Sequence, residues 1–284
     1  MRVVSLLPAA TEIVAALEAG DALVGVSHEC DWPPEVRSLP RVTRTTVDTS
    51  LPSGAIDRAM TAARGRGVPP VQLDLDLLRR LAPHVVIGQS VCEVYAVGAG
   101  ELARAAEVLG PGTRVVTLHA HTLQEVFADI TRVGEVLDLR EEAAELTDAM
   151  RDRLRWVAAR HVTPVARQPR VVVLEWVDPP YVAGHWVPQL IRIAGGCDVG
   201  ARPGERSRAV SWRDLTALAP DLVIVALCGL DEARARREVA ALDDPDARAL
   251  LNRRVEFLDG NAYTSRPGPR LGEAAERLAQ LIHG

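Results

Sequence analysis

Short apolar runs alternate with amphipathic stretches along this chain, a pattern that predicts alternating strands and helices. The apolar runs are rich in valine, isoleucine and leucine, which suit strands buried on both faces. Such runs lie at residues 2–7, 23–26, 85–88, 114–118, 170–174, 222–224 and 254–258. Apolar residues at helical spacing predict helices over residues 10–19, 57–66, 100–109, 187–194 and 270–282. Strands that alternate with helices predict parallel sheets, and ligands of such sheets bind beyond the carboxyl ends of the strands.

One ten-residue segment recurs in a similar form. Residues 78–87 read Leu-Arg-Arg-Leu-Ala-Pro-His-Val-Val-Ile, and residues 215–224 read Leu-Thr-Ala-Leu-Ala-Pro-Asp-Leu-Val-Ile. Each copy is typical of the end of a helix, a proline that cannot continue it, and a buried strand. The repeat predicts two similar α/β lobes, and two lobes imply a ligand-binding cleft between them.

The longest predicted helix covers residues 122–160, where apolar residues recur at helical spacing without a proline. Unbroken, it would span roughly 55 Å at about 1.5 Å per residue, more than the width of one lobe. The alternative is a kink near Asp138 to Glu141. The predicted fold class is therefore α/β, with two Rossmann-like lobes on parallel sheets joined by a single long helix. The predicted boundaries are 1–121 for the N-terminal lobe, 122–162 for the connecting helix and 163–284 for the C-terminal lobe.

Composition excludes several classes of protein. The 284 residues carry a net charge of -5, and no surface dense in basic residues is expected, which argues against nucleic acid as the main partner. No apolar run of about 18 residues is present, so no membrane insertion is expected. The chain enters its first strand directly after Met1, which predicts a cytoplasmic location, or an extracytoplasmic one if an export signal is missing. The four cysteines form no CxxC, and therefore no structural zinc site is predicted.

Aromatic side chains are scarce, and six of the ten are predicted to lie in loops that follow strands. Large, rigid aromatic groups at the carboxyl ends of strands suit the wall of a site for a flat or bulky ligand. The competing interpretation is that each ring packs over the end of its sheet. The six residues are Trp32, Tyr95, Trp176, Tyr181, Trp186 and Tyr263.

A second group combines imidazole, thiol and carboxylate side chains after two strands of the first lobe. It consists of His28, Glu29, Cys30 and Asp31 together with Cys92 and Glu93. These residue types can bind a borderline-soft metal or touch a ligand, but residues after strands also cap turns, and thiols pack well in cores.

Three further histidines are candidates in the same regions. His119 and His121 can chelate a metal or serve a hinge, and His185 follows Gly184, where the backbone can approach a ligand. Signatures of hydrolases, phosphate-binding loops and zinc proteases are absent, so no enzyme is expected.

Three segments resemble one family: residues 2–12, residues 25–34 with the sequence Gly-Val-Ser-His-Glu-Cys-Asp-Trp-Pro-Pro, and both copies of the repeat. They are similar to the helical-backbone, or class III, periplasmic solute-binding proteins, which deliver cobalamin, iron siderophores and haem to ABC transporters. The vitamin B12-binding members are the most similar. The resemblance covers essentially the whole chain and implies a non-catalytic, bilobed monomer that holds a cobalamin-like corrinoid between its lobes. It also implies ligand contacts from His28, Cys30, Trp32, Cys92, Tyr95, Trp176, Tyr181, His185, Trp186, Asn261 and Tyr263.

The resemblance implies a permease partner as well, but with altered contacts. Family members present a glutamate ahead of each repeat to dock on permease arginines, whereas the matching positions here are Asp76 and Arg213, with Asp214 adjacent. Together with the missing export signal, these altered positions suggest a cytoplasmic corrinoid-binding protein that no longer serves a transporter. The first alternative is a transporter component for haem or a metal siderophore. The second is a cytoplasmic metal-dependent enzyme that uses His28, Cys30 and Cys92.

Overall fold

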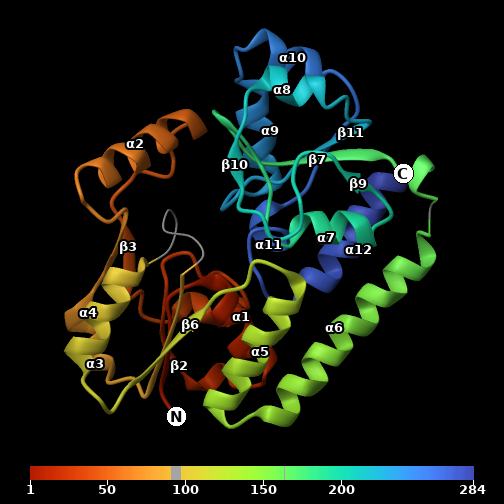
Figure 1. Ribbon diagram of the computed structural model, residues 1–284. Helices are drawn as coiled ribbons and strands as arrows, with labels where there is room; N and C mark the ends of the chain where they lie inside the picture. Colours follow the sequence, from red (N-terminus) through yellow and green to blue (C-terminus); the bar gives the residue numbers. More distant parts are fainter. Residues whose placement is uncertain (91–96, 163) are drawn as a thin grey trace. The chain divides into compact units, whose positions relative to one another are not determined.

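The computed structural model describes residues 1–90, 97–162 and 164–284 of the chain, which divides into two compact units. Figure 1 follows the chain through both. Unit 1 and unit 2 are not simply the two halves of the sequence, because the chain enters unit 2 twice before it stays there. Unit 1 comprises residues 1–51, 58–120 and 124–147, and unit 2 comprises residues 52–57, 121–123 and 148–284.

Unit 1 is built on a four-stranded parallel sheet in the order β2-β1-β5-β6, with a separate antiparallel pair of β3 and β4. Its elements, including helix α2 that both units share, are β1 (Val3–Ser5), α1 (Pro8–Ala16), η1 (Gly20–Ala22), β2 (Leu23–Val26), η2 (Pro34–Ser38), β3 (Thr43–Thr45), α2 (Ser53–Gly65), β4 (Val71–Leu73), α3 (Leu75–Leu81), β5 (Val85–Gln89), α4 (Ala99–Leu109), β6 (Arg114–Leu118) and α5 (Leu123–Leu137).

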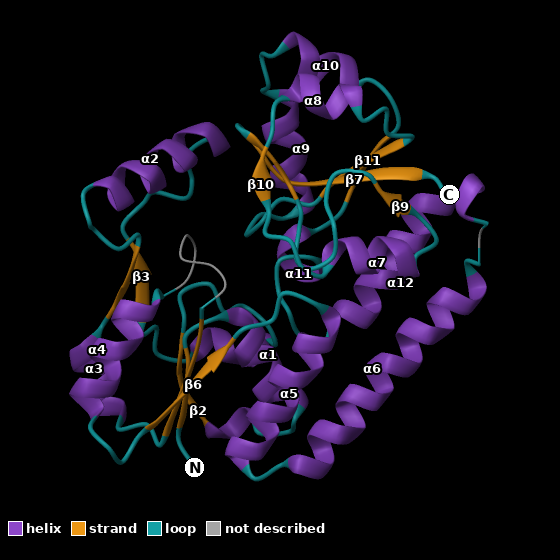
Figure 2. Ribbon diagram, viewed as in Figure 1, coloured by secondary structure: helices purple, strands orange, loops and turns teal. Residues whose placement is uncertain are grey.

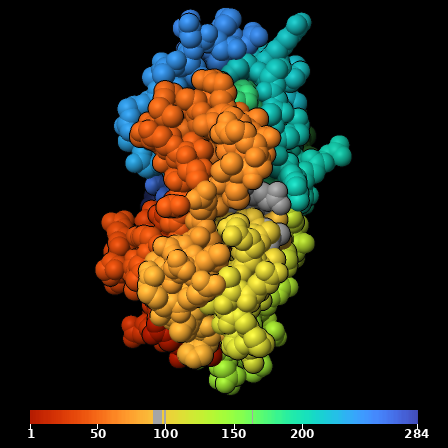
Figure 3. Space-filling model, turned by 90° about the vertical axis from the view of Figure 1, so that its left-hand side faces the viewer, coloured from red at the N-terminus to blue at the C-terminus, as the bar shows by residue number. Residues whose placement is uncertain are grey.

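Helices cover both faces of this sheet, α3 and α4 on one and α1 and α5 on the other (Figure 2). Val4 and Val86 of the sheet pack with Leu78 and Leu102 on the first face. Burial on both faces explains why the strands are continuous apolar runs. The outer surfaces of α3 and α4 face the viewer in the lower part of Figure 3.

Unit 2 is built on a six-stranded sheet in which β7, β9, β11 and β12 run parallel. Strand β8 pairs antiparallel with β7 on one side and with β10 on the other. Its core packs Leu174 and Val225 of the sheet against Trp212, Leu215 and Leu250. The elements that follow α5 are α6 (Arg140–Arg160), η3 (Val165–Arg167), β7 (Arg170–Val177), β8 (Pro180–Val182), α7 (Val187–Ile193), β9 (Cys197–Asp198), β10 (Arg208–Ala209), α8 (Trp212–Ala217), β11 (Leu222–Val225), α9 (Glu232–Ala240), α10 (Pro245–Leu251), β12 (Val255–Phe257), α11 (Gly260–Tyr263) and α12 (Leu271–His283).

The two copies of the repeated segment adopt the same local structure. In each copy the alanine before the proline turns the chain in the left-handed region, with φ 41° at Ala82 and 44° at Ala219. The strand that follows, β5 or β11, then lies inside its sheet with a parallel neighbour on either side. The predicted architecture of two α/β lobes is confirmed.

The segment predicted as one helix over residues 122–160 is two helices, α5 and α6. The break falls at Asp138, in the stretch where a kink was the alternative to one unbroken helix. Asp138 adopts a φ of 63°, a conformation that a short polar side chain tolerates. The N–H of Leu139 then bonds back to the carbonyl of Gly134 at 2.7 Å. Because a Cβ at Gly134 would meet both the Leu139 carbonyl and Ala143, only a glycine lets α6 start so close to α5. The single long helix that passes from unit 1 to unit 2 is α6, with 21 residues.

Residues 52–57, the first segment of unit 2, are held by the buried carboxylate of Glu238. Glu238 of α9 accepts a hydrogen bond from the N–H of Ser53 at 2.7 Å and another from Arg234 at 2.7 Å. A carboxylate at the first N–H groups of a helix is stabilising, and Glu238 supplies it to α2. These contacts lower the pKa of Glu238 in spite of its burial.

Candidate ligand-binding site

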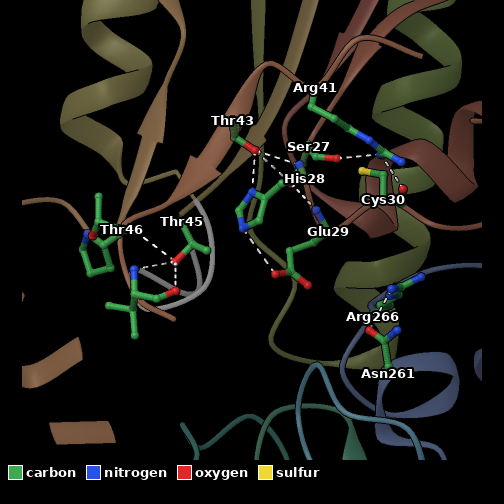
Figure 4. Close-up of polar contacts among 12 residues, drawn as sticks. Ser27, His28, Glu29, Cys30, Arg41, Thr43, Thr45, Thr46, Asn261 and Arg266 are labelled. Atoms are coloured by element: carbon green, nitrogen blue, oxygen red, sulfur yellow. Dashed lines mark hydrogen bonds and ion pairs between the residues drawn. The ribbon is translucent and has the colours of Figure 1, made fainter. Parts of the chain in front are cut away.

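The loop after β2 presents His28 at the carboxyl edge of the unit 1 sheet, as Figure 4 shows. Both ring nitrogens have neighbours: Nδ1 lies 2.7 Å from the hydroxyl of Thr43, and Nε2 lies 3.3 Å from a carboxylate oxygen of Glu29. The N–H of His28 donates to the same hydroxyl at 2.9 Å. Since 19% of the side chain is exposed, the ring is held in one orientation while part of it still reaches solvent.

Cys30 lies in the core rather than at the surface, with 1% of its area exposed. Its sulfur accepts a hydrogen bond from the Thr11 hydroxyl at 3.0 Å. Arg41 donates to the carbonyls of Cys30 and Ser27 at 2.5 and 2.9 Å, so this side chain ties the loop together. The geometry favours packing over ligand contact for this thiol. Cys92, Glu93 and Tyr95 lie outside the described residues, and their predicted contacts stay predictions.

Trp32 is the aromatic residue of this loop, and 45% of it is exposed. It lies four residues beyond His28, on the same edge of the sheet. A large exposed ring on the same loop as an oriented imidazole is a suitable surface for a flat organic ligand.

Trp176 and Tyr181 lie in strands and not in loops, which corrects the sequence prediction. β7 continues to Val177 and pairs with β8 as a hairpin in which Trp176 faces Tyr181 across the strands. The sequence prediction ended β7 at Leu174 because it missed this hairpin. Trp176 is 5% exposed and packs in unit 2, whereas Tyr181 is half-buried.

The turn before α7 is fixed by backbone bonds to a second loop. His185 adopts a φ of 55°, its N–H donates to the carbonyl of Glu205 at 2.6 Å, and its carbonyl accepts from Gly204 at 2.9 Å. The N–H of Gly184 donates to the Ser207 hydroxyl at 3.0 Å. A non-glycine residue in the left-handed region persists only where its surroundings enforce it.

Two rings flank the imidazole of His185. Its Nδ1 lies 2.9 Å from Nδ1 of His121, and its ring lies 5.5 Å from that of Trp186. Trp186 is 5% exposed, and its indole N–H donates to the carbonyl of Thr264 at 2.9 Å. Burial, followed by the nearby His121 and Arg206, lowers the pKa of His185 to about 4, and the ring is therefore neutral at pH 7.

A carboxyl group that the sequence analysis did not single out lies in β7. Burial raises the pKa of Glu175 to about 7, and a hydrogen bond with the Ser207 hydroxyl opposes that rise. Because Ser207 also accepts the N–H of Gly184, Glu175 is connected to the turn that carries His185.

Asn261 and Tyr263 belong to the short helix α11, where both polar groups have partners within unit 2. Arg266, which is buried, donates to Oδ1 of Asn261 at 2.7 Å, and the Tyr263 hydroxyl donates to Glu273 at 3.0 Å. Burial and the Glu273 carboxylate raise the pKa of Tyr263. Both residues are half-buried, and their ligand contacts stay predictions.

The predicted docking residues occupy matching places in the two units, in the first turns of α3 and α8. Both are exposed: Asp76 pairs with Arg79 at 3.2 Å, and Asp214 accepts the Ser211 hydroxyl at 2.7 Å. Arg213 is exposed beside Asp214.

His119 and His121 do not form the chelating pair that their spacing allowed. Nδ1 of His119 lies 2.6 Å from the Ser90 hydroxyl in unit 1, whereas His121 contacts His185 in unit 2. Among the residues that the structure describes, no three histidine, cysteine or acidic side chains converge as they would to hold a metal ion.

A pocket of about 740 Å³ lies elsewhere in unit 1. His84 and Arg114, which border it, stand at the starts of β5 and β6, so it lies at the amino edge of the sheet. The candidate chemistry around His28 lies at the other edge.

Sequence reasoning missed Thr43, Glu175 and Ser207, and it did not connect His121 with His185. Thr43 is 15 residues from His28, and Ser207 is 23 residues from Gly184. Small hydroxyl residues carry no signal in the sequence for such partners. Glu175 does, since a single acidic residue inside an apolar strand indicates a buried carboxyl group.

The comparison with protein families decides the class of protein. The family described as "Periplasmic binding protein" matches residues 3–259. The chain belongs to the periplasmic binding protein family. The resemblance noted in the sequence is thereby confirmed, and the family is one of solute-binding proteins rather than enzymes.

Curated relatives match over nearly the whole chain. An uncharacterized ABC transporter substrate-binding lipoprotein of Bacillus subtilis is 23% identical, covering 99% of this chain and 80% of the relative. A vitamin B12-binding protein of Vibrio cholerae is 22% identical, covering 99% of this chain and 88% of the relative.

Solved structures show the same fold. A periplasmic heme-binding protein of Pseudomonas aeruginosa superposes with a TM-score of 0.74 at 22% identity, over 99% of this chain and 92% of that one. The periplasmic vitamin B12-binding protein of Vibrio cholerae gives 0.69 at 22% identity, over 99% and 96%.

The family also bears on location. It is periplasmic by description, which fits the extracytoplasmic alternative and gives no support to the cytoplasmic prediction. Of the helices that the structure describes, none is both long enough and apolar enough to cross a membrane.

Proposed function

We propose that this periplasmic binding protein binds a cobalamin-like corrinoid without catalysing a reaction on it. The observation that carries the proposal is the exposed ring of Trp32 on the same loop as the fixed imidazole of His28, at the edge where parallel sheets bind ligands. Unit 2 has candidate contacts of its own, the half-buried Tyr181 and the turn with His185.

The chemistry of the first loop suits a large neutral ligand. A corrin offers an extended apolar face to an indole ring and amide side chains to hydroxyl and imidazole groups. Relatives support this choice, since one from Vibrio cholerae is named a vitamin B12-binding protein. Another from Halobacterium salinarum, 25% identical over 99% of this chain, is named a cobalamin-binding protein.

Haem is the second candidate, favoured by the fold neighbours. The Pseudomonas aeruginosa structure and a second from Vibrio cholerae are both titled heme-binding proteins. A metal siderophore is a third ligand that the same class of site could take.

A permease is the proposed protein partner. The Bacillus subtilis relative is named a component of an ABC transporter, and Asp76 and Asp214 give this chain one exposed carboxylate at the start of equivalent helices in both units. Carboxylates in these two places can dock on permease arginines, although Arg213 adds a positive charge beside Asp214.

Titration of the purified protein with cyanocobalamin and, in parallel, with hemin tests the proposed ligand. Tryptophan quenching and a change in visible absorbance are expected with cyanocobalamin at micromolar protein. Saturable binding of hemin without any response to cyanocobalamin would assign the site to haem. Absence of binding by either compound would refute the proposal.

Replacement of Trp32 by alanine is expected to weaken cyanocobalamin binding at least about tenfold, because an exposed indole at the centre of a site contributes at least about 1.4 kcal/mol. Trp156→Ala is the matched control, since Trp156 is 53% exposed on α6, far along the chain from the loop. Isothermal titration calorimetry measures both affinities. Equal affinities of the two variants would show that Trp32 is not part of the site.

A further inference from the structure

The connection between β6 and α5 is anchored twice, once in each unit. On the unit 1 side, the N–H groups of His119 and Ala120 both donate to Oδ2 of Asp129, at 2.8 and 3.0 Å. Asp129 is buried and pairs with Arg132 at 2.6 Å. The chain is thus fixed to unit 1 up to residue 120.

The next three residues, His121–Leu123, belong to unit 2. The N–H of Leu123 donates to the buried side chain of Gln189 at 2.8 Å. The ring of His121 meets that of His185, with Nδ1 atoms 2.9 Å apart and ring centroids 5.0 Å apart. The contact between His121 and His185 therefore lies beside a second, buried hydrogen bond of the same three-residue segment.

The turn that His121 contacts has its backbone fixed but not its imidazole. Bonds to Glu205 and Gly204 hold the main chain of His185, and Thr264 holds the neighbouring Trp186. Rotation of the His185 ring is limited by its side-chain neighbours, and His121 is hydrogen-bonded to the ring. Its other ring neighbour is Trp186.

We propose that His121 is a positioning residue for the ligand: it holds the imidazole of His185 in one orientation on the turn that unit 2 offers to the ligand. This inference rests on the proposed function for the role of that turn. It adds that a ligand in contact with His185 also affects His121, the first residue after Ala120 that belongs to unit 2.

The bond requires one N–H and one lone pair, so at least one of the two rings is neutral. Arg206 lies near the His185 ring and disfavours its protonation. The nearby carboxyl group, Glu175, is linked to the turn through the Ser207 hydroxyl. Glu205 faces the turn with its backbone carbonyl. Because the His185 ring is neutral at pH 7, it can supply either the N–H or the lone pair of this bond.

The test uses three variants of the full chain, and a fourth serves to assign the NMR signals. His121→Leu removes the bond, His121→Asn retains an amide close to the position of Nδ1, and His119→Leu is the control because His119 bonds Ser90 in unit 1. Histidine-ring NMR of the ligand-free protein follows the titration of His185, assigned with His185→Gln. The His185 titration is expected to move upward by about one pH unit or more in His121→Leu, because a freed ring gains solvent and loses its neighbour. His121→Asn and His119→Leu are expected to titrate as the wild type does.

The second measurement is affinity for cyanocobalamin and hemin. His121→Leu is expected to lose about threefold or more in affinity for whichever compound the wild type binds, with recovery in His121→Asn. A His185 titration unchanged in His121→Leu, or displaced equally in His119→Leu, would overturn the positioning role. If the wild type binds neither compound, the proposed function fails, while the NMR titration still decides whether His121 positions His185.

Discussion

Replacing Gly184 by alanine is expected to destabilise unit 2 by about 2 to 4 kcal/mol. A Cβ at this position would lie against the carbonyl of Glu205, and 2.7 Å from both the Arg206 carbonyl carbon and the Ser207 nitrogen. All three atoms belong to backbone that is held by hydrogen bonds to the same turn. No side-chain rotation can relieve the contact, and the two loops must separate.

Urea denaturation measures this loss as a fall in the free energy of unfolding, and ligand affinity should fall with it because His185 is displaced. Gly20→Ala is the control, since a Cβ there would meet nothing within 4 Å. Wild-type stability of Gly184→Ala would show that the 184–187 turn and the 204–207 loop are not in tight contact.

Replacing Glu175 by glutamine is expected to stabilise the protein above pH 7, by up to about 3 kcal/mol. The pKa of Glu175 is raised from 4.5 to about 7 by burial. Between these two values the folded chain keeps a proton that the unfolded chain releases. The contribution of Glu175 is therefore fully favourable below pH 4.5 and is lost as the pH rises through 7. Glutamine keeps the acceptor for Ser207 and carries no charge.

Thermal or urea unfolding from pH 4 to pH 9 measures the difference between wild type and variant, which should grow with pH and level off above 7. Glu276→Gln is a control of opposite sign. Arg153 lowers the pKa of Glu276, so the stability that this carboxylate adds is present above pH 4.5 and lost in acid. A pH-independent difference for Glu175→Gln would show that the pKa of Glu175 is the same in the folded and the unfolded chain.

The apolar pattern predicted the main strands and helices well because both sheets are buried on two faces. Strands β2 and β6 have the predicted bounds. The pattern missed β8, β9 and β10, which have two or three residues each and exist only because β7 offers them an edge, directly or through β8. It left the break at Asp138 open as an alternative, because a close approach of two helices at Gly134 decides the conformation there.

The candidate site was predictable in position more than in chemistry. His28 and Trp32 follow a strand of a parallel sheet, and that alone places them at the edge where ligands of such sheets bind. The thiol group was less predictable, because a sequence does not distinguish a packing cysteine from a ligand, and Cys30 turned inward to Thr11. Trp176 was misplaced for a related reason: the hairpin that buries it depends on pairing with β8.

Two short segments of unit 2, residues 52–57 and 121–123, are synthesised before the rest of that unit. All residues of unit 1 exist once residue 147 has left the ribosome, so this unit can fold first. Ser53 must wait for Glu238, 185 residues later, and Leu123 for Gln189, 66 residues later. At about 10 residues per second these delays are roughly 20 and 7 seconds. During that time the nascent chain carries two short segments whose binding surfaces have not yet been made, and a chaperone that recognises them would find them only in this window.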